Sequence, residues 1–326
     1  MRGRKQFWLT AGAVIIAFIL LYYSFRGTDW GRVRYLLLGA RWSYIGLALS
    51  IATISLALRA LRFRALLEVK GSVSTASVFW ATAAASLGNN VLPARAGEVV
   101  RTWMMSSGGQ LSGAFILVTA LSERIVDAIV LIAIGATVVL IVPGQPGWLE
   151  KATSSFVIAG FIGVVAIAIL PRMESFGRNL ARRIRCSPSL RKRTERVLES
   201  CLLAVRSFHD PRRLLRFLGA TALIWALDAG GSMVCANAIG LQLRLGTAFI
   251  LLAGLGLGSA LPSAPAYAGI YQFVAVSVLV PAGFTRSDAI AYILLLQALS
   301  YLVTGLWGGI GLARYHRMTV LADAVV

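Results

Sequence analysis

The chain has 326 residues, of which 58% are hydrophobic and 14% charged, and its mean hydropathy is +0.77. Soluble domains average roughly 45–50% apolar and about a quarter charged residues, so this composition excludes an ordinary soluble protein and indicates a polytopic membrane protein. The net charge of +19 comes from 32 Lys and Arg against 13 Asp and Glu. Because the arginines cluster between apolar runs, the charge fits the positive-inside rule and anionic lipid headgroups. No nucleic-acid partner is predicted, because no recognition motif accompanies the charge.

The cysteines and histidines do not form a metal or disulfide pattern. Cys186, Cys201 and Cys235 contain no CxxC pair, and His209 and His316 lie among arginines. A zinc site or a disulfide framework needs closely spaced partners. We therefore predict no metal and no cofactor.

The first part of the chain is predicted to contain two spans joined by an interfacial helix. The apolar run from Phe7 to Phe25 follows a basic start and is expected to be an uncleaved span with a cytosolic N-terminus. Residues 26–42 have the periodicity of an amphipathic helix at the membrane surface. Ser43 to Leu61 forms the next span, and its cytosolic end is marked by Arg59, Arg62 and Arg64.

Four further spans are expected, and a basic segment separates two of them. The spans are Leu111 to Val142, Phe156 to Leu170, Phe217 to Ile239 and Tyr292 to Leu312. The segment 171–216 carries thirteen Lys and Arg against four acidic residues, so we place it in the cytosol and partly on the inner leaflet. The alternative is a plain topology signal with no defined lipid site. Both termini are expected to be cytoplasmic, in a multi-pass protein of the cell inner membrane.

A broken helix is predicted near residue 93. The run from Ala76 to Leu92 is about 17 residues long, which is marginal for crossing a bilayer core of roughly 30 Å. Pro93 should end the helix, Gly97 permits a tight reversal, and Glu98 and Arg101 can pair on one helix face. We expect a re-entrant hairpin entering from the cytosol. The alternatives are that the run crosses the membrane, or that an ordinary loop carries a surface ion pair.

A second interrupted segment has a similar pattern. Thr247 to Leu261 and Phe273 to Pro281 flank a stretch with Pro262, Pro265 and Gly269. Like the first break, it joins Leu-Pro to a glycine a few residues later. The order of the spans brings the two hairpins in from opposite sides, as in transporters with inverted repeats and a midplane site. The alternative is a coincidence of two Leu-Pro pairs.

Several charges fall at membrane depth, where ionisable residues usually mark function. Glu123 and Asp127 share a helix face beside Arg124, so they should point into the protein. Asp228 is a lone acid, with Arg95 or Arg124 as its candidate partner. The alternative is a static salt bridge that only fastens helices together.

The motifs resemble the flippase-like membrane domain of bacterial lysylphosphatidylglycerol synthases, which also occurs as a stand-alone protein. Three ordered motifs carry the resemblance, and it covers essentially the whole chain: Asn90-x-x-Pro93-x-Arg95-x-Gly97-Glu98-x-x-Arg101, Glu123-Arg124-x-x-Asp127 and Pro262-Ser263-x-Pro265 through Gly269. The resemblance implies lipid movement between leaflets. In full-length synthases an aminoacyltransferase domain follows, whereas this chain stops shortly after Arg317, so no synthase activity is expected. Ala266 stands where the family usually has Gly, and Gln272 where it often has Glu.

We therefore predict one transmembrane domain over residues 1–326: an all-α integral membrane protein of about six full spans and two oppositely oriented re-entrant hairpins. The predicted function is a lipid flippase, not an enzyme, that moves a phospholipid through a midplane polar cavity. The alternative is a non-catalytic accessory subunit of a lipid, lipid-linked glycan or hopanoid pathway. Expected partners are membrane lipids, anionic phospholipid above all, with a homo-oligomer or a separate lipid-modifying enzyme as further partners. The predicted substrate-binding residues are Asn90, Arg95, Glu98, Arg101, Glu123, Arg124, Asp127, Asp228, Tyr267, Tyr271 and Gln272, and the helix-breaking residues are Pro93, Gly97, Pro262, Pro265 and Gly269.

Overall fold

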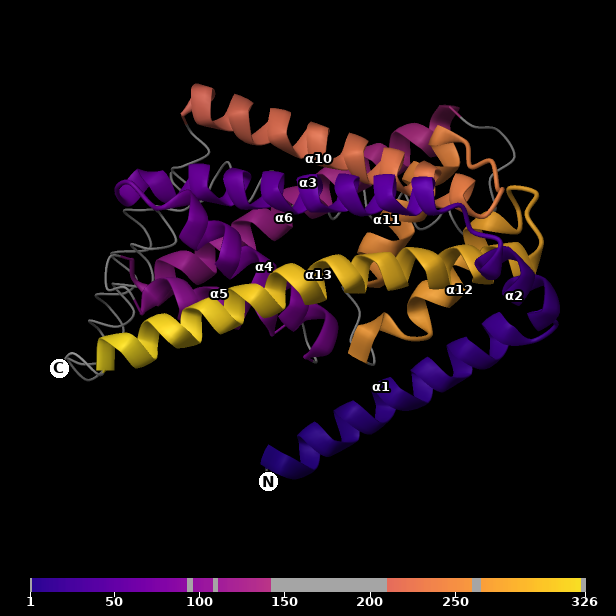
Figure 1. Ribbon diagram of the computed structural model, residues 1–326, viewed down its shortest axis with the longest axis horizontal. Coiled ribbons are helices and arrows are strands. Elements are labelled where there is room, and N and C mark those ends of the chain that lie inside the picture. Colours follow the sequence, from indigo (N-terminus) through magenta and orange to yellow (C-terminus); the bar gives the residue numbers. More distant parts are fainter. Residues whose placement is uncertain (1, 93–95, 108–110, 142–209, 260–264, 324–326) are drawn as a thin grey trace, which may run out of the picture.

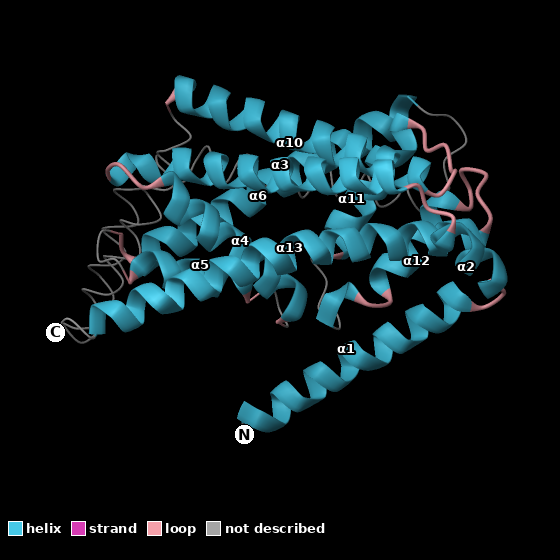
Figure 2. Ribbon diagram, in the orientation of Figure 1, coloured by secondary structure: helices cyan, strands magenta, loops and turns pink. Residues whose placement is uncertain are grey.

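The computed structural model describes residues 2–92, 96–107, 111–141, 210–259 and 265–323, and in these residues the secondary structure is helical (Figure 2). Three of the described helical stretches are long and apolar enough to cross a membrane, namely Trp42–Leu67, Arg212–Ala238 and Arg286–Arg317. The prediction of a polytopic helical membrane protein is thereby confirmed. The predicted span from Phe156 to Leu170 and most of the basic segment 171–216 lie outside the described residues.

The helices follow the chain in two groups (Figure 1). The first group is α1 (Arg2–Phe25), α2 (Trp30–Leu38), α3 (Trp42–Leu67), α4 (Thr75–Val91), α5 (Gly97–Ser106) and α6 (Gly113–Ile141), with a short 3-10 turn at Glu68–Lys70. The second group is α10 (Pro211–Ala238), α11 (Leu245–Gly258), the 3-10 turn η4 (Pro265–Tyr267), α12 (Ile270–Leu279) and α13 (Arg286–Asp323).

Local sequence explains where several helices begin. The Asp29 carboxylate accepts a hydrogen bond from the Arg32 N–H at 3.1 Å and caps α2, which is the predicted amphipathic helix and buries Val33. Asp210 caps α10 in the same way, and Pro211 occupies the first helical position, where its missing N–H costs nothing.

The two groups repeat one pattern of a long helix, two short helices and a long helix. The first run is α3, α4, α5 and α6, and the second is α10, α11, α12 and α13. The leading helices α3 and α10 lie side by side and antiparallel, because the Arg41 N–H donates to the Ala238 carbonyl at 2.8 Å while Arg62 reaches Thr221 at 2.9 Å (Figure 1). The packing is reciprocal: α4 lies against α13, and α11 lies against α6. This reciprocal packing is what the possible inverted repeat would produce.

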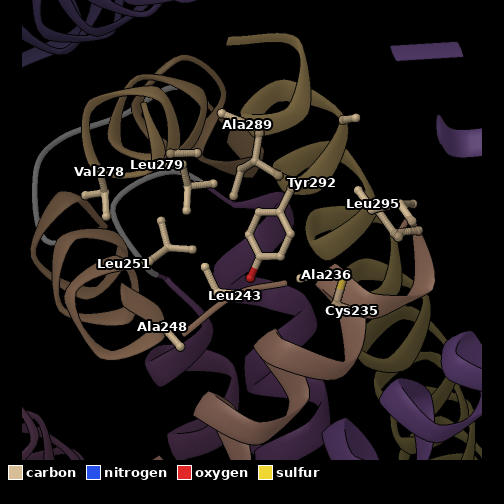
Figure 3. Packing of buried hydrophobic residues seen from close by; sticks show 14 of the residues in the cluster. Cys235, Ala236, Leu243, Ala248, Leu251, Val278, Leu279, Ala289, Tyr292 and Leu295 are labelled. Atoms are coloured by element: carbon tan, nitrogen blue, oxygen red, sulfur yellow. The ribbon is translucent and has the colours of Figure 1, made fainter. Parts of the chain in front are cut away.

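The largest apolar core belongs to the second group. Figure 3 shows Tyr292 of α13 at its centre, surrounded by aliphatic side chains of α10, α11 and α12. The Tyr292 hydroxyl donates to the Ser232 carbonyl at 3.4 Å. This core fixes the position of α13, and α4 of the first hairpin and α12 of the second hairpin both pack against α13.

Candidate functional site

The first hairpin closes through a close approach between its two helices. α4 ends at Val91, and Leu92 is extended, as expected for the residue before a proline. The Asn89 carboxamide oxygen accepts a hydrogen bond from the Gly97 N–H at 3.0 Å. A Cβ atom on Gly97 would lie only 1.9 Å from the Ala85 carbonyl oxygen. The sequence predicted that Gly97 permits a tight reversal of the backbone. In the structure Gly97 is required for another reason, since only a residue without a side chain fits against Ala85 and Asn89 of α4. Pro93 and Arg95 lie outside the described residues.

Behind this hairpin, three arginines and three carboxylates form one ion network with no net formal charge. Its members come from three helices: Arg62 of α3, Glu98 and Arg101 of α5, and Glu123, Arg124 and Asp127 of α6. Five of the six were predicted site residues. The predicted pairing of Glu98 with Arg101 is present, and Glu123 and Asp127 do face the same way.

Arg62 is the fully buried centre of this network, and sequence reasoning missed it. A guanidinium has five N–H donors, and in Arg62 all five are used. Two go to Glu123 at 3.1 and 2.7 Å, two to Asp127 at 2.6 and 2.9 Å, and one to Thr221 at 2.9 Å. Its guanidinium also lies over the Phe217 ring at 4.9 Å. Arg62 therefore has no donor left for a ligand, and its role is to fasten α3, α6 and α10 together.

The other two arginines keep donor capacity. Arg101 donates to Glu123 at 3.2 Å and to Glu98, while its Nε–H has no hydrogen-bond partner in the described part of the chain. Arg124 donates twice to one oxygen of Glu98, at 3.1 and 2.8 Å, and its remaining contact, to Asp127, is long at 3.7 Å. A ligand phosphate would therefore compete most easily for Arg124.

The second hairpin turns through left-handed backbone and is fastened by neutral groups. Gly269 has a φ of +86°, and Ala266 and Tyr267 have φ of 63° and 54°. Non-glycine residues adopt such angles only when the surroundings hold them there. The Gly269 N–H donates to the side-chain oxygen Oε1 of Gln272 at 2.8 Å, and the side-chain NH2 group of Gln272 donates to Oε1 of Gln297 in α13 at 2.7 Å.

Gln297 and Tyr301 of α13 complete this turn. Both donate to the Ala266 carbonyl, and Gln297 also donates to the Tyr301 hydroxyl at 2.9 Å. The rings of Tyr267 and Tyr271 stack with centroids 4.8 Å apart. The predicted residues Tyr267, Tyr271 and Gln272 thus belong to a hydrogen-bonded and aromatic cluster at the second hairpin. Pro262 and the side chain of Pro265 are outside the described part.

One stretch of α13 brings the two hairpins together. Asn90, near the end of α4, donates to the Thr304 hydroxyl at 2.9 Å, while Tyr301, one turn earlier, binds the Ala266 carbonyl of η4. η4 and α4 also pack directly against each other. Both broken ends therefore lie beside the same turn of α13, the geometry that two opposed half-helices need in order to share a site.

Among the described residues, Asp228 pairs with Arg59 and not with the candidate Arg124, while the other candidate, Arg95, lies outside the described residues. Asp228 forms an ion pair with Arg59 and accepts a hydrogen bond from Ser55 at 2.6 Å, both from the facing helix α3. Arg124 instead binds Glu98. The alternative of Arg124 was wrong, because Arg59 had been assigned to the cytosolic end of a shorter span, whereas α3 continues to Leu67.

Replacing Asp228 with Asn should lower the free energy of unfolding by about 1–3 kcal/mol, because Arg59 loses its charged partner at a partly buried position. The midpoint of thermal unfolding in detergent measures the effect. The exchanged pair Arg59→Asp with Asp228→Arg should recover part of the loss. Equal losses for the single and the exchanged variant would contradict a direct pairing.

A signal for Arg62 was present in the sequence. The apolar residues Phe63, Leu66 and Leu67 continue the helix pattern beyond it, and all three are buried. The membrane-depth acids Glu123 and Asp127 also required cations. The sequence analysis nevertheless placed Arg62 at the cytosolic end of a span, because Arg59 and Arg64 lie beside it and basic residues collect at such ends.

Comparison with known protein families identifies the family of this chain. Residues 9–308 match the family model described as lysylphosphatidylglycerol synthase TM region. The chain belongs to this family. No curated protein matches the chain at a significant level. Membership in the lysylphosphatidylglycerol synthase TM-region family, together with the apolar helices, indicates a membrane protein with a lipid-related role.

Proposed function

We propose that this protein moves a phospholipid between the two leaflets, as a transporter with no catalytic step. The observation that carries the proposal is the ion network behind the first broken helix. Charges at membrane depth are costly and usually functional, and here the saturated Arg62 provides a scaffold while Arg101 and Arg124 retain donor capacity. Arginine forks suit phosphate oxygens.

The inverted repeat supports the same proposal. Two opposed broken helices beside one turn of α13 form the kind of midplane site that transporters with inverted repeats use. In this proposal the headgroup passes through a polar cavity between the hairpins, with the phosphate held by arginines and any cationic group by carboxylates. The lipid is an anionic phospholipid of the cell inner membrane, and both termini are cytoplasmic.

The test is lipid movement in proteoliposomes containing fluorescent anionic, zwitterionic or aminoacylated lipids. Glu98→Gln should slow movement at least about tenfold, a loss of about 1.4 kcal/mol, because no carboxylate is then left at this position to displace the phosphate from Arg124 and Arg101. The amide keeps one acceptor oxygen where the carboxylate uses two, so the midpoint of thermal unfolding is measured on the same variant to show that it is folded. The matched control is Glu68→Gln, at an exposed pair with Arg64, which should move lipid at the wild-type rate.

Two outcomes would overturn the proposal. If well-folded wild-type protein moves none of the lipids, an accessory role in a lipid, lipid-linked glycan or hopanoid pathway is favoured. If Glu98→Gln and Glu68→Gln both move lipid as fast as wild type, the network is a static fastening.

A further inference from the structure

One member of the ion network, Arg124, is only partly buried. The Arg124 side chain is 38% exposed, although it lies eleven residues, or about 16 Å, from the start of the 29-residue helix α6. Its neighbours on the exposed face of α6 are apolar: Leu117, Ile125 and Leu121, the last 52% exposed. Glu98 engages Nε and one terminal nitrogen of Arg124, whereas the other terminal nitrogen has only the 3.7 Å contact to Asp127, and a cation among apolar side chains at this depth is stabilised by a further anionic group.

The adjoining helix α5 continues this apolar surface. Val99 and Trp103, four residues apart on one face, are 62% and 56% exposed. Glu98 precedes Val99 and binds Arg124 across the junction between α5 and α6. The junction therefore presents a charged centre with apolar side chains on both sides, which matches the polarity pattern of a phospholipid.

The carboxylate of Glu98 can release Arg124 without being left alone. One of its oxygens accepts from Arg124, and the other accepts from Arg101. Arg101 is in turn held by Glu123. If a phosphate replaced Glu98 on Arg124, Glu98 would keep its pairing with Arg101, so no carboxylate would lose its last arginine, and the network with its ligand would carry one net negative charge.

We propose that a phospholipid enters sideways from the bilayer at the α5–α6 junction. Its phosphate takes the place of Glu98 on Arg124, and its acyl chains lie along the exposed faces of α5 and α6. This inference rests on the proposed function and names the entry point for the transported lipid. It makes Arg124 a binding residue at the boundary between bilayer and protein, in contrast to the scaffold residue Arg62.

The test uses the full chain in vesicles of phosphatidylcholine and phosphatidylglycerol, containing a small fraction of phosphatidylglycerol with a photoactivatable diazirine on one acyl chain. After illumination, labelled positions are located by mass spectrometry. Wild type should be labelled on α5 and α6 around Val99, Leu121 and Ile125. Arg124→Gln should lower this labelling about tenfold, equivalent to about 1.4 kcal/mol. Leu302 and Leu306, exposed on α13, report bulk lipid and should be labelled equally in both proteins.

Arg124→Lys provides a second variant in case Arg124→Gln does not fold. It keeps the charge but loses the planar fork, so labelling at the junction should fall while labelling on α13 stays constant. Added glycerol phosphate, which has the phosphate but no chains, should not reduce labelling. A reduction by glycerol phosphate would mean that the site takes a free phosphate compound, and this would overturn the lipid assignment.

Labelling and transport are measured on the same samples, so the two proposals can fail separately. If lipid moves but labelling at the junction is the same in the wild type and in Arg124→Gln, the entry point is overturned and the transport proposal stands. Labelling that depends on Arg124 without lipid movement would support the lipid site and contradict transport. The absence of both would overturn both.

Discussion

Replacing Arg62 with Met should lower the free energy of unfolding by about 3–5 kcal/mol, the range for removing one partner of a buried ion pair. The change leaves Glu123 and Asp127 close together and buried, with four charged hydrogen bonds lost. It also removes the connection to Thr221 of α10. The midpoint of thermal unfolding in detergent should fall markedly below that of the wild type.

The matched control is Arg64→Met, two residues further along α3. Arg64 is partly exposed, pairs with the exposed Glu68, and also donates to the Val73 carbonyl and the Thr75 hydroxyl, so its loss should cost about 1–2 kcal/mol, less than the loss at Arg62. A double variant, Arg62→Met with Asp127→Asn, should recover part of the stability, because the two arginines and two carboxylates that remain keep the network neutral. Equal shifts for Arg62→Met and Arg64→Met would contradict the scaffold role of Arg62.

Replacing Gly97 with Ala should open the first hairpin. The added methyl group would lie 1.9 Å from the Ala85 carbonyl oxygen and 2.7 Å from the Asn89 nitrogen, and both are backbone atoms that no side-chain rotation can move. Helices α4 and α5 would have to separate. We expect a loss of about 3 kcal/mol, at the upper end for overpacking, and loss of lipid movement in proteoliposomes, because Glu98 and Arg101 begin the displaced helix.

Gly305→Ala serves as the control for this change. Gly305 lies within α13, where an added Cβ meets no atom within 4 Å. Alanine also favours helix over glycine by up to about 1 kcal/mol, so the variant should be as stable as wild type or more stable. Wild-type stability and transport in Gly97→Ala would show that the two helices of the hairpin are not held in the close contact seen here.

These results would separate two kinds of arginine in one network. Arg62 has all its donors engaged and should matter for stability. Arg124 is partly exposed, shares its carboxylate with Arg101, and should matter for lipid binding. The difference follows from how many partners each guanidinium has and how much of it reaches the surface, since both residues carry the same charge.

The amino-acid sequence by itself determined the features that depend on neighbours along the chain. Helix periodicity located the described spans and the surface helix α2, and the prolines marked where the hairpins break. The spacing of three between Glu98 and Arg101 was enough to predict their pairing, because helix geometry places residues three or four apart on one face. The common face of Glu123 and Asp127 followed for the same reason.

Only the tertiary structure decided which distant groups meet. Arg62 and Arg59 looked like the end of a span, but α3 continues past both, and its antiparallel packing on α10 sets Arg59 against Asp228 and Arg62 against Thr221. The meeting of both hairpins on one turn of α13 was equally invisible. The physical reason is that such contacts depend on the rotation and register of one helix against another. The rotation and the register are fixed by side-chain packing between helices and by the pairing of buried charges. The spacing of residues along one helix determines neither the rotation nor the register.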